Sequence, residues 1–291
     1  PDGTAVVVGT SGSTGIPKQV VLSGEALRTS AEATAARIGS GQWLLALPAG
    51  YVAGLQVLVR SILAGTAPAL LSGRFSPQTF AEATLSLVRT GSEALYTSLV
   101  PAQVATLLDA VDDVAVRAAV QAYRAILVGG QSLPEPLRER AQEAGMRVVR
   151  TYGSTETSGG CVYDGQPLDT VAVRSVDGEL HIAGPVLADG YLGDPELTDE
   201  RFLRDDHGIR WYRTGDLGIV EDGIVRVHGR ADNVIVSGGI NVSLDLVEHI
   251  VRQVPGLGSA IVVGVDHDRW GEASVIVAVR GESLRRSEAE Q

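Results

Sequence analysis

The sequence predicts an α/β protein with a large N-terminal domain of layered sheets and helices and a small, incomplete α+β C-terminal domain. Apolar strand patterns alternate with helical patterns over residues 1–170. Short strand patterns separated by turn signals follow over residues 171–230, which indicates a β-rich subdomain. Residues 231–291 mix both patterns. We therefore expect an N-terminal domain over residues 1–230 and a C-terminal domain over residues 231–291.

The first 170 residues predict a largely parallel sheet covered by helices. The β-branched run at residues 5–8 predicts a buried strand that stops at Gly9 and leads into a loop of Gly, Ser and Thr. Further strands are expected over residues 43–47, 67–71, 94–97 and 125–128. Helices are expected over residues 24–38, 54–63, 76–88, 101–108, 113–121 and 134–144. Strands separated by helices of this length are typical of α/β layers.

Beyond residue 170 the strands become short and the turns tight. Strands are expected over residues 171–173, 179–182, 218–220 and 224–227. The pairs Asp177-Gly178 and Asp222-Gly223 are hairpin signals, because both residues tolerate a positive φ. The C-terminal part predicts a strand over residues 233–236, a helix over 244–253 and strands over 259–265 and 274–279.

Composition limits the classes of partner. The net charge of −11 repels polyanions and no basic stripe offsets it, so we expect no nucleic-acid partner. No apolar run approaches the roughly 20 residues that span a bilayer, and no signal-peptide pattern opens the sequence, so we expect a cytoplasmic protein. The single cysteine, Cys161, excludes an internal disulfide and is interpreted as structural. A homodimer stays open as one alternative for the oligomeric state.

The loop after the first strand carries the chemistry expected of a phosphate site. It reads Thr10-Ser11-Gly12-Ser13-Thr14-Gly15-Ile16-Pro17-Lys18. Its glycines let backbone N–H groups point inward, its hydroxyl groups add donors, and Lys18, the only lysine in the sequence, adds a positive charge. It differs from the P-loop of NTPases, because Pro17 intervenes and no Ser or Thr follows the lysine. The alternative is a flexible surface turn.

Three further segments, taken together with this loop, resemble the motifs of one known family. They are Tyr152-Gly153-Ser154-Thr155-Glu156-Thr157, Tyr212-Arg213-Thr214-Gly215-Asp216 and Gly229-Arg230-Ala231-Asp232. In this order the four segments resemble the motifs of the adenylate-forming superfamily, which includes acyl-CoA synthetases, luciferases and peptide-synthetase adenylation domains. The resemblance covers nearly the whole chain. It implies an acid–thiol ligase that uses ATP, Mg²⁺ and CoA, in which a carboxylic acid becomes an acyl-adenylate and then a thioester.

The resemblance also assigns roles to residues of this sequence. Tyr152 would pack on adenine, Thr155 would contact the α-phosphate and Glu156 would bind Mg²⁺. The implied ATP-binding residues are Thr10, Ser11, Gly12, Ser13, Thr14, Gly15, Lys18, Gly129, Gly130, Tyr152, Gly153, Ser154, Thr155, Asp216 and Arg230. Those implied in catalysis are Lys18, Thr155, Glu156 and Arg230. Asp232 would be the hinge of a mobile C-terminal domain, truncated here, with Gly238 and Gly239 in a turn that approaches CoA. The alternatives are an ordinary polar turn with Glu156 in solvent and a turn-capping Asp216.

The substrate acid is indicated by one arginine. The expected acyl-binding residues are Tyr51, Gly54, Arg60 and Ser98, in segments that most resemble the o-succinylbenzoate-CoA ligases of menaquinone biosynthesis. Arg60 stands in an apolar helical stretch, where an unpaired charge is costly, so it would meet a second carboxylate of the substrate. A salt bridge or an exposed helix end are the alternatives. Tyr51 replaces a histidine that is common in these ligases.

Two departures from the family keep other functions open. The family has a longer segment before the phosphate loop and a lysine near its C-terminus, and neither occurs in these 291 residues. We expect the chain to be part of a longer protein, since half a small domain would leave its core exposed. The alternatives are another aryl- or acyl-CoA ligase, a peptide-synthetase-like adenylation module and, from a different class, a non-catalytic nucleotide-binding sensor.

Overall fold

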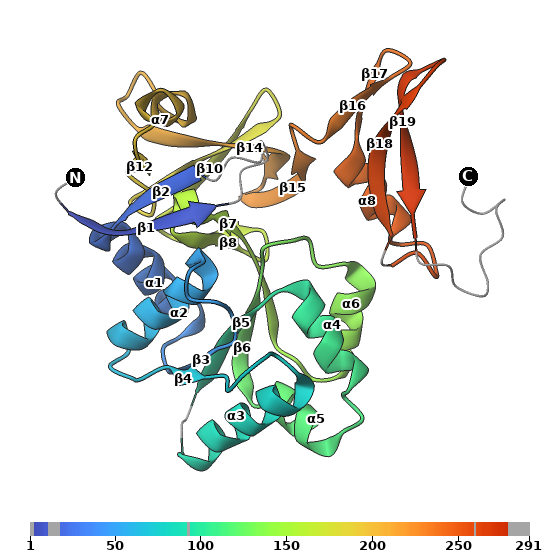
Figure 1. Ribbon diagram of the computed structural model, residues 1–291. Helices are drawn as coiled ribbons and strands as arrows, with labels where there is room; N and C mark the ends of the chain where they lie inside the picture. Colours follow the sequence, from blue (N-terminus) through green and yellow to red (C-terminus); the bar gives the residue numbers. More distant parts are fainter. Residues whose placement is uncertain (1–2, 11–17, 92–93, 259, 279–291) are drawn as a thin grey trace.

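A computed structural model describes residues 3–10, 18–91, 94–258 and 260–278, and its centre is a seven-stranded sheet (Figure 1). The strand order is β4-β3-β5-β6-β7-β8-β9. Pairing is parallel from β4 to β7 and antiparallel at β8 and β9. The strands are β3 (Gln42–Leu45), β4 (Ala69–Leu70), β5 (Leu95–Leu99), β6 (Tyr123–Val128), β7 (Val148–Ser154), β8 (Gly159–Tyr163) and β9 (Gln166–Pro167). The prediction of a largely parallel sheet is confirmed.

Helices cover both faces of this sheet, so its central strands β5 and β6 are almost entirely buried. The helices are α1 (Gly24–Ile38), α2 (Val52–Leu63), α3 (Pro77–Arg89), α4 (Pro101–Asp109), α5 (Val114–Gln121) and α6 (Glu135–Glu143). Neighbouring residues of one strand point to different cores. Trp43 packs with residues of α1 and α2, whereas Leu44 packs with residues of α3 to α6. Burial on both faces explains the continuous apolar runs that predicted these strands.

The chain begins with a separate three-stranded antiparallel sheet. It consists of β1 (Thr4–Thr10), β2 (Lys18–Ser23) and β12 (Gly190–Tyr191), in the order β1-β2-β12. A strand is present at residues 5–8, as predicted, but the prediction that it is buried is wrong. Strand β1 is an outer strand, and only Val8 in it is buried. The buried strand is β2, through Val20, Val21 and Leu22, and it was not expected. Lys18 is therefore the first residue of a strand.

A β-rich unit follows, as the sequence predicted. It contains β10 (Ala172–Val176), β11 (Glu179–Ala183), α7 (Pro195–Arg201), β13 (Phe202–Arg204), β14 (Arg210–Glu221) and β15 (Ile224–Arg230). The sheet order is β10-β11-β14-β13, with β15 paired to β14. Asp177 and Gly178 have φ of 52° and 85°, and Asp222 and Gly223 have φ of 51° and 77°. These are the positive values of a two-residue hairpin turn, so both predicted hairpins are confirmed.

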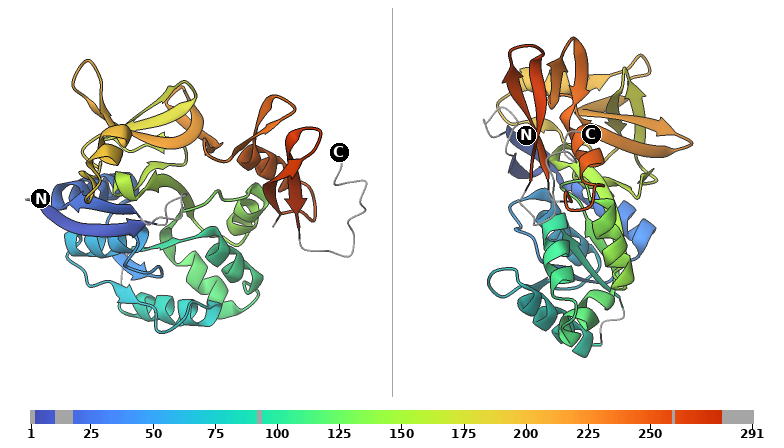
Figure 2. Two further views of the ribbon diagram at one scale, coloured as in Figure 1. Left: turned by 45° about the horizontal axis from the view of Figure 1, so that its top comes forward. Right: turned by 90° about the vertical axis from the view of Figure 1, so that its right-hand side faces the viewer.

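The C-terminal part forms a four-stranded sheet with one helix, set beside the end of β15 (Figures 1 and 2). Its elements are β16 (Val234–Ser237), β17 (Ile240–Ser243), α8 (Leu244–Val251), β18 (Ile261–His267) and β19 (Gly271–Val277), in the sheet order β17-β16-β19-β18. The predicted helix over residues 244–253 ends two residues early, at Val251. Strand β17 was not expected. The domain boundary after residue 230 stays a prediction.

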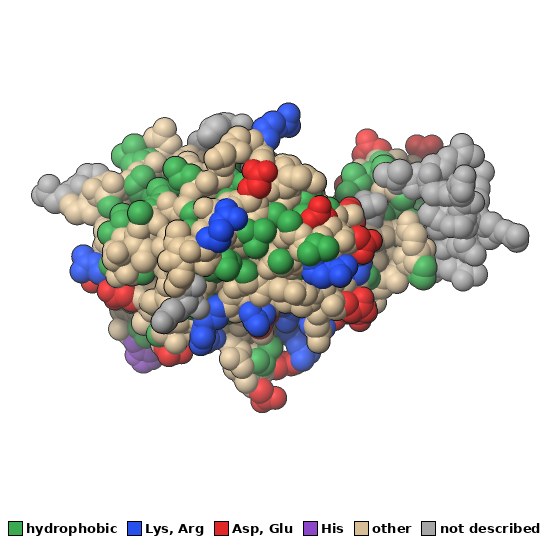
Figure 3. Space-filling view, turned by 90° about the horizontal axis from the view of Figure 1, so that it is seen from below, with side chains coloured by type: hydrophobic (Ala, Val, Ile, Leu, Met, Phe, Trp, Pro, Cys, Tyr) green, Lys and Arg blue, Asp and Glu red, His purple; other side chains and the backbone are tan. Residues whose placement is uncertain are grey.

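The surface of the large domain carries charges of both signs. On the face drawn in Figure 3, acidic and basic side chains lie scattered among apolar ones. Among the described residues, none of the helices has the length and apolar content that crossing a bilayer requires.

Candidate functional site

The site begins at the carboxyl end of β7, where the chain changes direction. Strand β7 runs through Ser154, so Tyr152 and Gly153 lie in a strand. A single 3-10 turn, η1 (Thr155–Thr157), follows. Thr157 Oγ1 accepts a hydrogen bond from the Ser154 N–H (2.9 Å) and donates one to the Gly159 carbonyl (2.8 Å). This local pairing fixes Thr155 and Glu156, which are both buried.

Glycines allow the strand ends to approach each other here. A Cβ on Gly153 would overlap the carbonyl oxygen of Gly159, because β7 and β8 lie very close. A Cβ on Gly129, directly after β6, would overlap Thr151 Oγ1. Gly130 follows with a φ of 83°. The two predicted nucleotide-contacting glycines thus lie beside β7, at the same end of the parallel sheet as Tyr152.

Strand β14 brings Asp216 to this sheet edge from the β-rich unit. The Tyr152 hydroxyl donates a hydrogen bond to Asp216 Oδ2 (2.7 Å), and Arg230 Nη1 donates one to Asp216 Oδ1 (3.1 Å). Burial raises the pKa of Asp216, and this effect outweighs the opposite influence of Tyr152 and Arg230. Burial and the neighbouring Asp216 also raise the pKa of Tyr152, so its hydroxyl stays a donor at neutral pH. A carboxylate has lone pairs beyond these two bonds, so ribose hydroxyls can also donate to it.

A residue that the sequence did not single out, Tyr191, joins Glu156 to Lys18. Tyr191 lies in β12, which pairs with β2, and its hydroxyl donates a hydrogen bond to Glu156 Oε1 (2.9 Å). Lys18 Nζ lies 5.8 Å from the centre of the Tyr191 ring, within the range of a cation–π contact. Burial and Glu156 raise the pKa of Tyr191. Tyr191 therefore contacts Lys18 through its ring and Glu156 through its hydroxyl.

The middle of the predicted phosphate loop, Ser11, Gly12, Ser13, Thr14 and Gly15, lies outside the described residues. Its two flanks are described: Thr10 ends β1, Lys18 begins β2, and these two residues are directly paired. The loop therefore starts and ends at the strand pair that carries Lys18 towards Tyr191.

The carboxylate of Glu156 fits a magnesium ion that shares its coordination with a substrate. Glu156 is 8% exposed and has one oxygen bonded to Tyr191. Among the described residues, no group of three or more His, Cys, Asp or Glu side chains could hold a metal ion. Mg²⁺ is commonly held by one or two carboxylates together with substrate phosphates, and a single buried carboxylate suits that arrangement.

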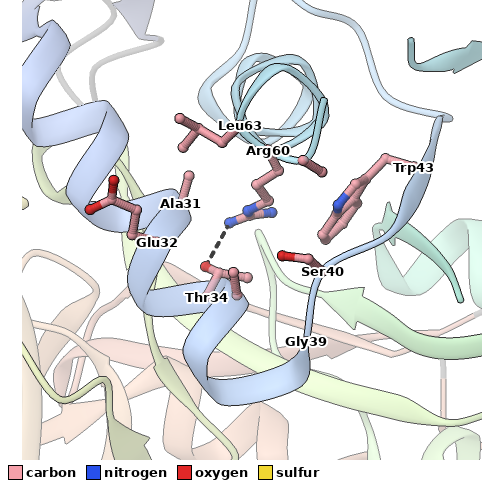
Figure 4. Close-up of a pocket in the computed structure, with 10 residues that line it drawn as sticks. Ala31, Glu32, Thr34, Gly39, Ser40, Trp43, Arg60 and Leu63 are labelled. Carbon is pink, nitrogen blue, oxygen red and sulfur yellow. Dashed lines mark hydrogen bonds between the residues drawn. The ribbon is translucent and has the colours of Figure 1, made fainter. Parts of the chain in front are cut away.

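Arg60 lies at a second position, in a cavity between α1 and α2 (Figure 4). Its Nη2 donates to Thr34 Oγ1 (3.3 Å) and to the Tyr163 hydroxyl (3.4 Å), and its guanidinium lies over the Trp43 ring at 5.0 Å. Arg60 is 7% exposed, and burial lowers its pKa. No carboxylate of the described residues lies within ion-pair distance of it, so the alternatives of a salt bridge and an exposed helix end are both wrong within that part of the chain.

The cavity at Arg60 has a volume of about 180 Å³. It is lined by Ala31, Glu32, Thr34, Ala35, Gly39, Ser40, Trp43, Arg60, Leu63 and Ala64. The other three residues predicted for the acyl group do not line it. Tyr51 is 62% exposed at the start of α2, Ser98 is buried in β5, and Gly54 is buried where a Cβ would overlap the Pro48 carbonyl oxygen.

The predicted hinge lies directly beside the candidate nucleotide site. Asp216 and Arg230 are cross-strand partners in the hairpin of β14 and β15. Arg230 also binds both carboxylate oxygens of Asp232, at 3.0 and 3.1 Å. Gly238 and Gly239 form the turn between β16 and β17, with φ of 57° and 83°, and a Cβ on Gly238 would meet the Trp270 ring at 2.7 Å. This turn and this contact require glycine without any ligand.

Comparison with known proteins places the chain in a family. The family model described as "AMP-binding enzyme" matches residues 1–192. The chain is 42% identical over 288 residues to a probable 2-succinylbenzoate–CoA ligase of Mycobacterium tuberculosis, covering 97% of this chain and 72% of the relative. It is 30% identical over 279 residues to the 2-succinylbenzoate–CoA ligase of Escherichia coli strain K12, covering 92% of this chain and 57% of the relative.

Solved structures show the same likeness. The o-succinylbenzoate CoA synthetase (MenE) from Bacillus subtilis, in complex with the acyl-adenylate intermediate OSB-AMP, has a TM-score of 0.83 at 29% identity. The likeness covers 99% of this chain, but the chain spans only 61% of that protein's length. The same synthetase in complex with AMP has a TM-score of 0.83 at 28% identity, covering 99% of this chain and 62% of that protein. The chain belongs to the AMP-binding enzyme family, in the group of the 2-succinylbenzoate–CoA ligases.

Proposed function

We propose that this chain forms the nucleotide- and acid-binding part of a ligase that uses ATP to convert o-succinylbenzoate first into its acyl-adenylate and then into its CoA thioester. The observation that carries the proposal is the convergence of four segments. Tyr152 and Glu156 from the end of β7 reach Asp216 on one side and Tyr191, next to Lys18, on the other. An aromatic ring, a ribose-binding carboxylate, a metal-binding carboxylate and a cation together match the parts of ATP.

The proposed reaction has two steps. In the first, an oxygen of the substrate carboxylate attacks the α-phosphorus of ATP, the bond to the β-phosphate breaks, and pyrophosphate leaves. In the second, the CoA thiol loses its proton to solvent, the resulting thiolate attacks the acyl carbon, and the bond to AMP breaks. Activation is needed because a free carboxylate has no competent leaving group. Lys18 and the N–H groups of its loop would stabilise the charge that develops on the phosphates.

Glu156 would hold Mg²⁺ together with the phosphates of ATP. The ion would supply neutralisation of phosphate charge. The role of the protein side chains is to position this carboxylate, and Tyr191 does so through its hydrogen bond of 2.9 Å.

The proposal of o-succinylbenzoate as the acid is supported by Arg60 and by the relatives. A buried guanidinium without a carboxylate partner among the described residues leaves a site for a substrate anion, since unpaired buried charges are costly. o-Succinylbenzoate carries two carboxylates, of which only one is activated. The named relatives and solved structures reported above are ligases of this acid.

The test is pyrophosphate release by the full-length protein with ATP, Mg²⁺ and a panel of acids, with and without CoA. We expect release that depends on o-succinylbenzoate, and thioester only when CoA is added. Release with a different aryl or acyl acid would replace the substrate assignment. Tight ATP binding with no release for any acid would contradict the ligase and support a nucleotide sensor.

A further inference from the structure

The second residue of α8, Asp245, contacts the chain on both sides of the predicted hinge. Its Oδ2 accepts a hydrogen bond from the backbone N–H of Arg230, and its Oδ1 accepts one from Asn233 Nδ2, each at 2.6 Å. Arg230 precedes Asp232 in the chain, and Asn233 follows it. One carboxylate of the C-terminal part therefore spans the linker between β15 and β16.

The contact between Asp245 and the Arg230 backbone is not an ordinary helix cap. The N-cap of α8 is Ser243, whose side chain accepts from the Leu246 N–H. Asp245 instead packs on Gly229, where a Cβ would lie only 2.5 Å from Asp245 Cβ. Gly229 has a φ of 145°, which disfavours other residues. A side chain at position 229 would thus push Asp245 away from Arg230.

The same arginine reaches into the nucleotide site. Arg230 Nη1 binds Asp216 Oδ1 and the Thr214 carbonyl oxygen, each at 3.1 Å. Its backbone is held by Asp245 and its side chain by Asp216. A single residue, Arg230, therefore connects α8 to Asp216, the carboxylate that is expected to bind ribose.

We propose that Asp245 is a positioning residue that latches the C-terminal domain in one orientation and aligns Arg230 for the nucleotide. This inference rests on the proposed function. If the chain turns at Asp232, then Arg230 stays with the large domain, while Asn233 and Asp245 move together. The bond from Asp245 to Asn233 survives such a rotation and the bond to Arg230 breaks. The latch therefore favours one of the two half-reactions over the other.

The orientation can be measured without any reaction. Cysteine labels at Val114 in α5 and at Asp268 between β18 and β19 would report the distance between the domains by electron-spin resonance in the full-length protein. Cys161 is buried and its pKa is raised by burial to about 12, so it does not compete for thiol labels. We expect one narrow distance population in the unmodified protein, and a broader one after Asp245→Ala.

Two variants guard against a folding defect. Gly229→Ala keeps the carboxylate but blocks its approach, so it should broaden the distances as Asp245→Ala does. Asp266→Ala removes an exposed acid from the same domain and should leave them unchanged. Distances that stay narrow in both Asp245→Ala and Gly229→Ala overturn the latch.

The ratio of the rates of the two half-reactions gives a second test, because a merely structural role of Asp245 would leave this ratio unchanged. ATP–pyrophosphate exchange measures adenylation, and a single turnover of preformed acyl-adenylate with CoA measures thioester formation. We expect Asp245→Ala to change the ratio of the two rates at least threefold, and Asp266→Ala to leave it unchanged. A constant ratio contradicts the proposal. If the unmodified protein shows neither half-reaction, the proposed function fails, while the distance measurement still decides the latch.

Discussion

The hydroxyl of Tyr152 donates a 2.7 Å hydrogen bond to Asp216, which lies 64 residues further along the chain. Tyr152 belongs to β7 of the seven-stranded sheet, and Asp216 belongs to β14 of the β-rich unit. The candidate nucleotide site therefore lies at the seam between two sheets. Its geometry depends on how these sheets pack, so changes at the seam should affect nucleotide binding more than overall stability.

Tyr152→Phe removes only the hydroxyl at this seam. A hydrogen bond to a charged group contributes about 1.5–3 kcal/mol, but Arg230 still holds Asp216, so we expect ATP affinity to fall by about three- to tenfold. Isothermal titration measures this effect. The matched control is Tyr123→Phe, which removes a buried hydroxyl bonded to Thr84 in the other core. If both variants bind ATP equally well, the Tyr152 hydroxyl has no part in the site.

Asp216→Asn should abolish ATP binding without lowering the melting temperature at pH 7. Its effect on the melting temperature should depend on pH. Burial raises the pKa of Asp216 in the folded state. The contribution of Asp216 to the free energy of unfolding is therefore fully present below the unfolded-state pKa and is lost as the pH rises through the folded-state pKa. Asparagine imitates the protonated form at every pH. We expect the nucleotide-free variant to melt at or above the parent temperature at pH 7, with the difference shrinking towards pH 4, while ATP binding is lost.

Melting curves between pH 4 and pH 8, with and without ATP, measure both effects. A variant that melts well below the parent at pH 7 but equals it at pH 4 would show that the ionised carboxylate stabilises the fold, which contradicts this prediction.

Arg60→Met should affect the acid far more than the nucleotide. Methionine keeps the apolar stem of the side chain but removes the charge that would meet the second carboxylate. We expect KM for o-succinylbenzoate to rise at least about tenfold, or 1.4 kcal/mol, and KM for ATP to change less than about twofold. Stability should be unchanged or increased, because a buried charge without an ionic partner is costly and methionine removes it.

Steady-state kinetics with o-succinylbenzoate and with its monoester at the carboxylate that is not activated tests the assignment. The monoester lacks the charge that Arg60 would bind, so the variant should no longer distinguish the two acids. An equal rise in both KM values would remove Arg60 from substrate recognition.

Gly54→Ala should destabilise the protein, although alanine favours helices by about 1 kcal/mol over glycine. Gly54 lies in the first turn of α2, and a Cβ there would overlap the Pro48 carbonyl oxygen. Gly50→Ala is the matched control, since a Cβ at that position has no atom within 4 Å. Thermal melts should place Gly54→Ala several degrees below the parent and Gly50→Ala near it. A melt of Gly54→Ala at the parent temperature would show that α2 can shift away from Pro48.

Local signals in the sequence were enough to predict much of the fold. The turns at Asp177-Gly178 and Asp222-Gly223 were predictable because few residue pairs tolerate two successive positive φ values. The buried parallel strands were predictable because both of their faces are apolar. Strand β2 was missed because Val20 to Leu22 form a short run, and only pairing with β1 and β12 makes it a strand.

Only those residues of the candidate site that lie in recognisable sequence motifs were predicted. Tyr152, Glu156 and Asp216 belong to recognisable segments, and the structure brings them together. Tyr191 was missed because its contact with Glu156 depends on the two-residue strand β12 pairing with β2, for which the sequence carries no local signal. Asp245 was missed for a similar reason, since an acid in the first turn of a helix ordinarily interacts with the helix dipole.

The hairpin of β14 and β15 sets Asp216 directly opposite Arg230, with a bulge between Leu217 and Gly218. Side chains along a strand alternate between faces, so shifting the pairing by one residue turns a side chain to the other side. A Cβ on Gly218 would overlap the Arg226 carbonyl oxygen, which leaves the bulge little room to absorb a shift. Strand β14 is also held by β11, so an insertion or deletion of one residue at the Asp222-Gly223 turn would shift β15 and turn Arg230 away from Asp216, even if every residue named above were kept. For this chain, the number of residues between Asp216 and Arg230 is as much a part of the binding chemistry as their identity.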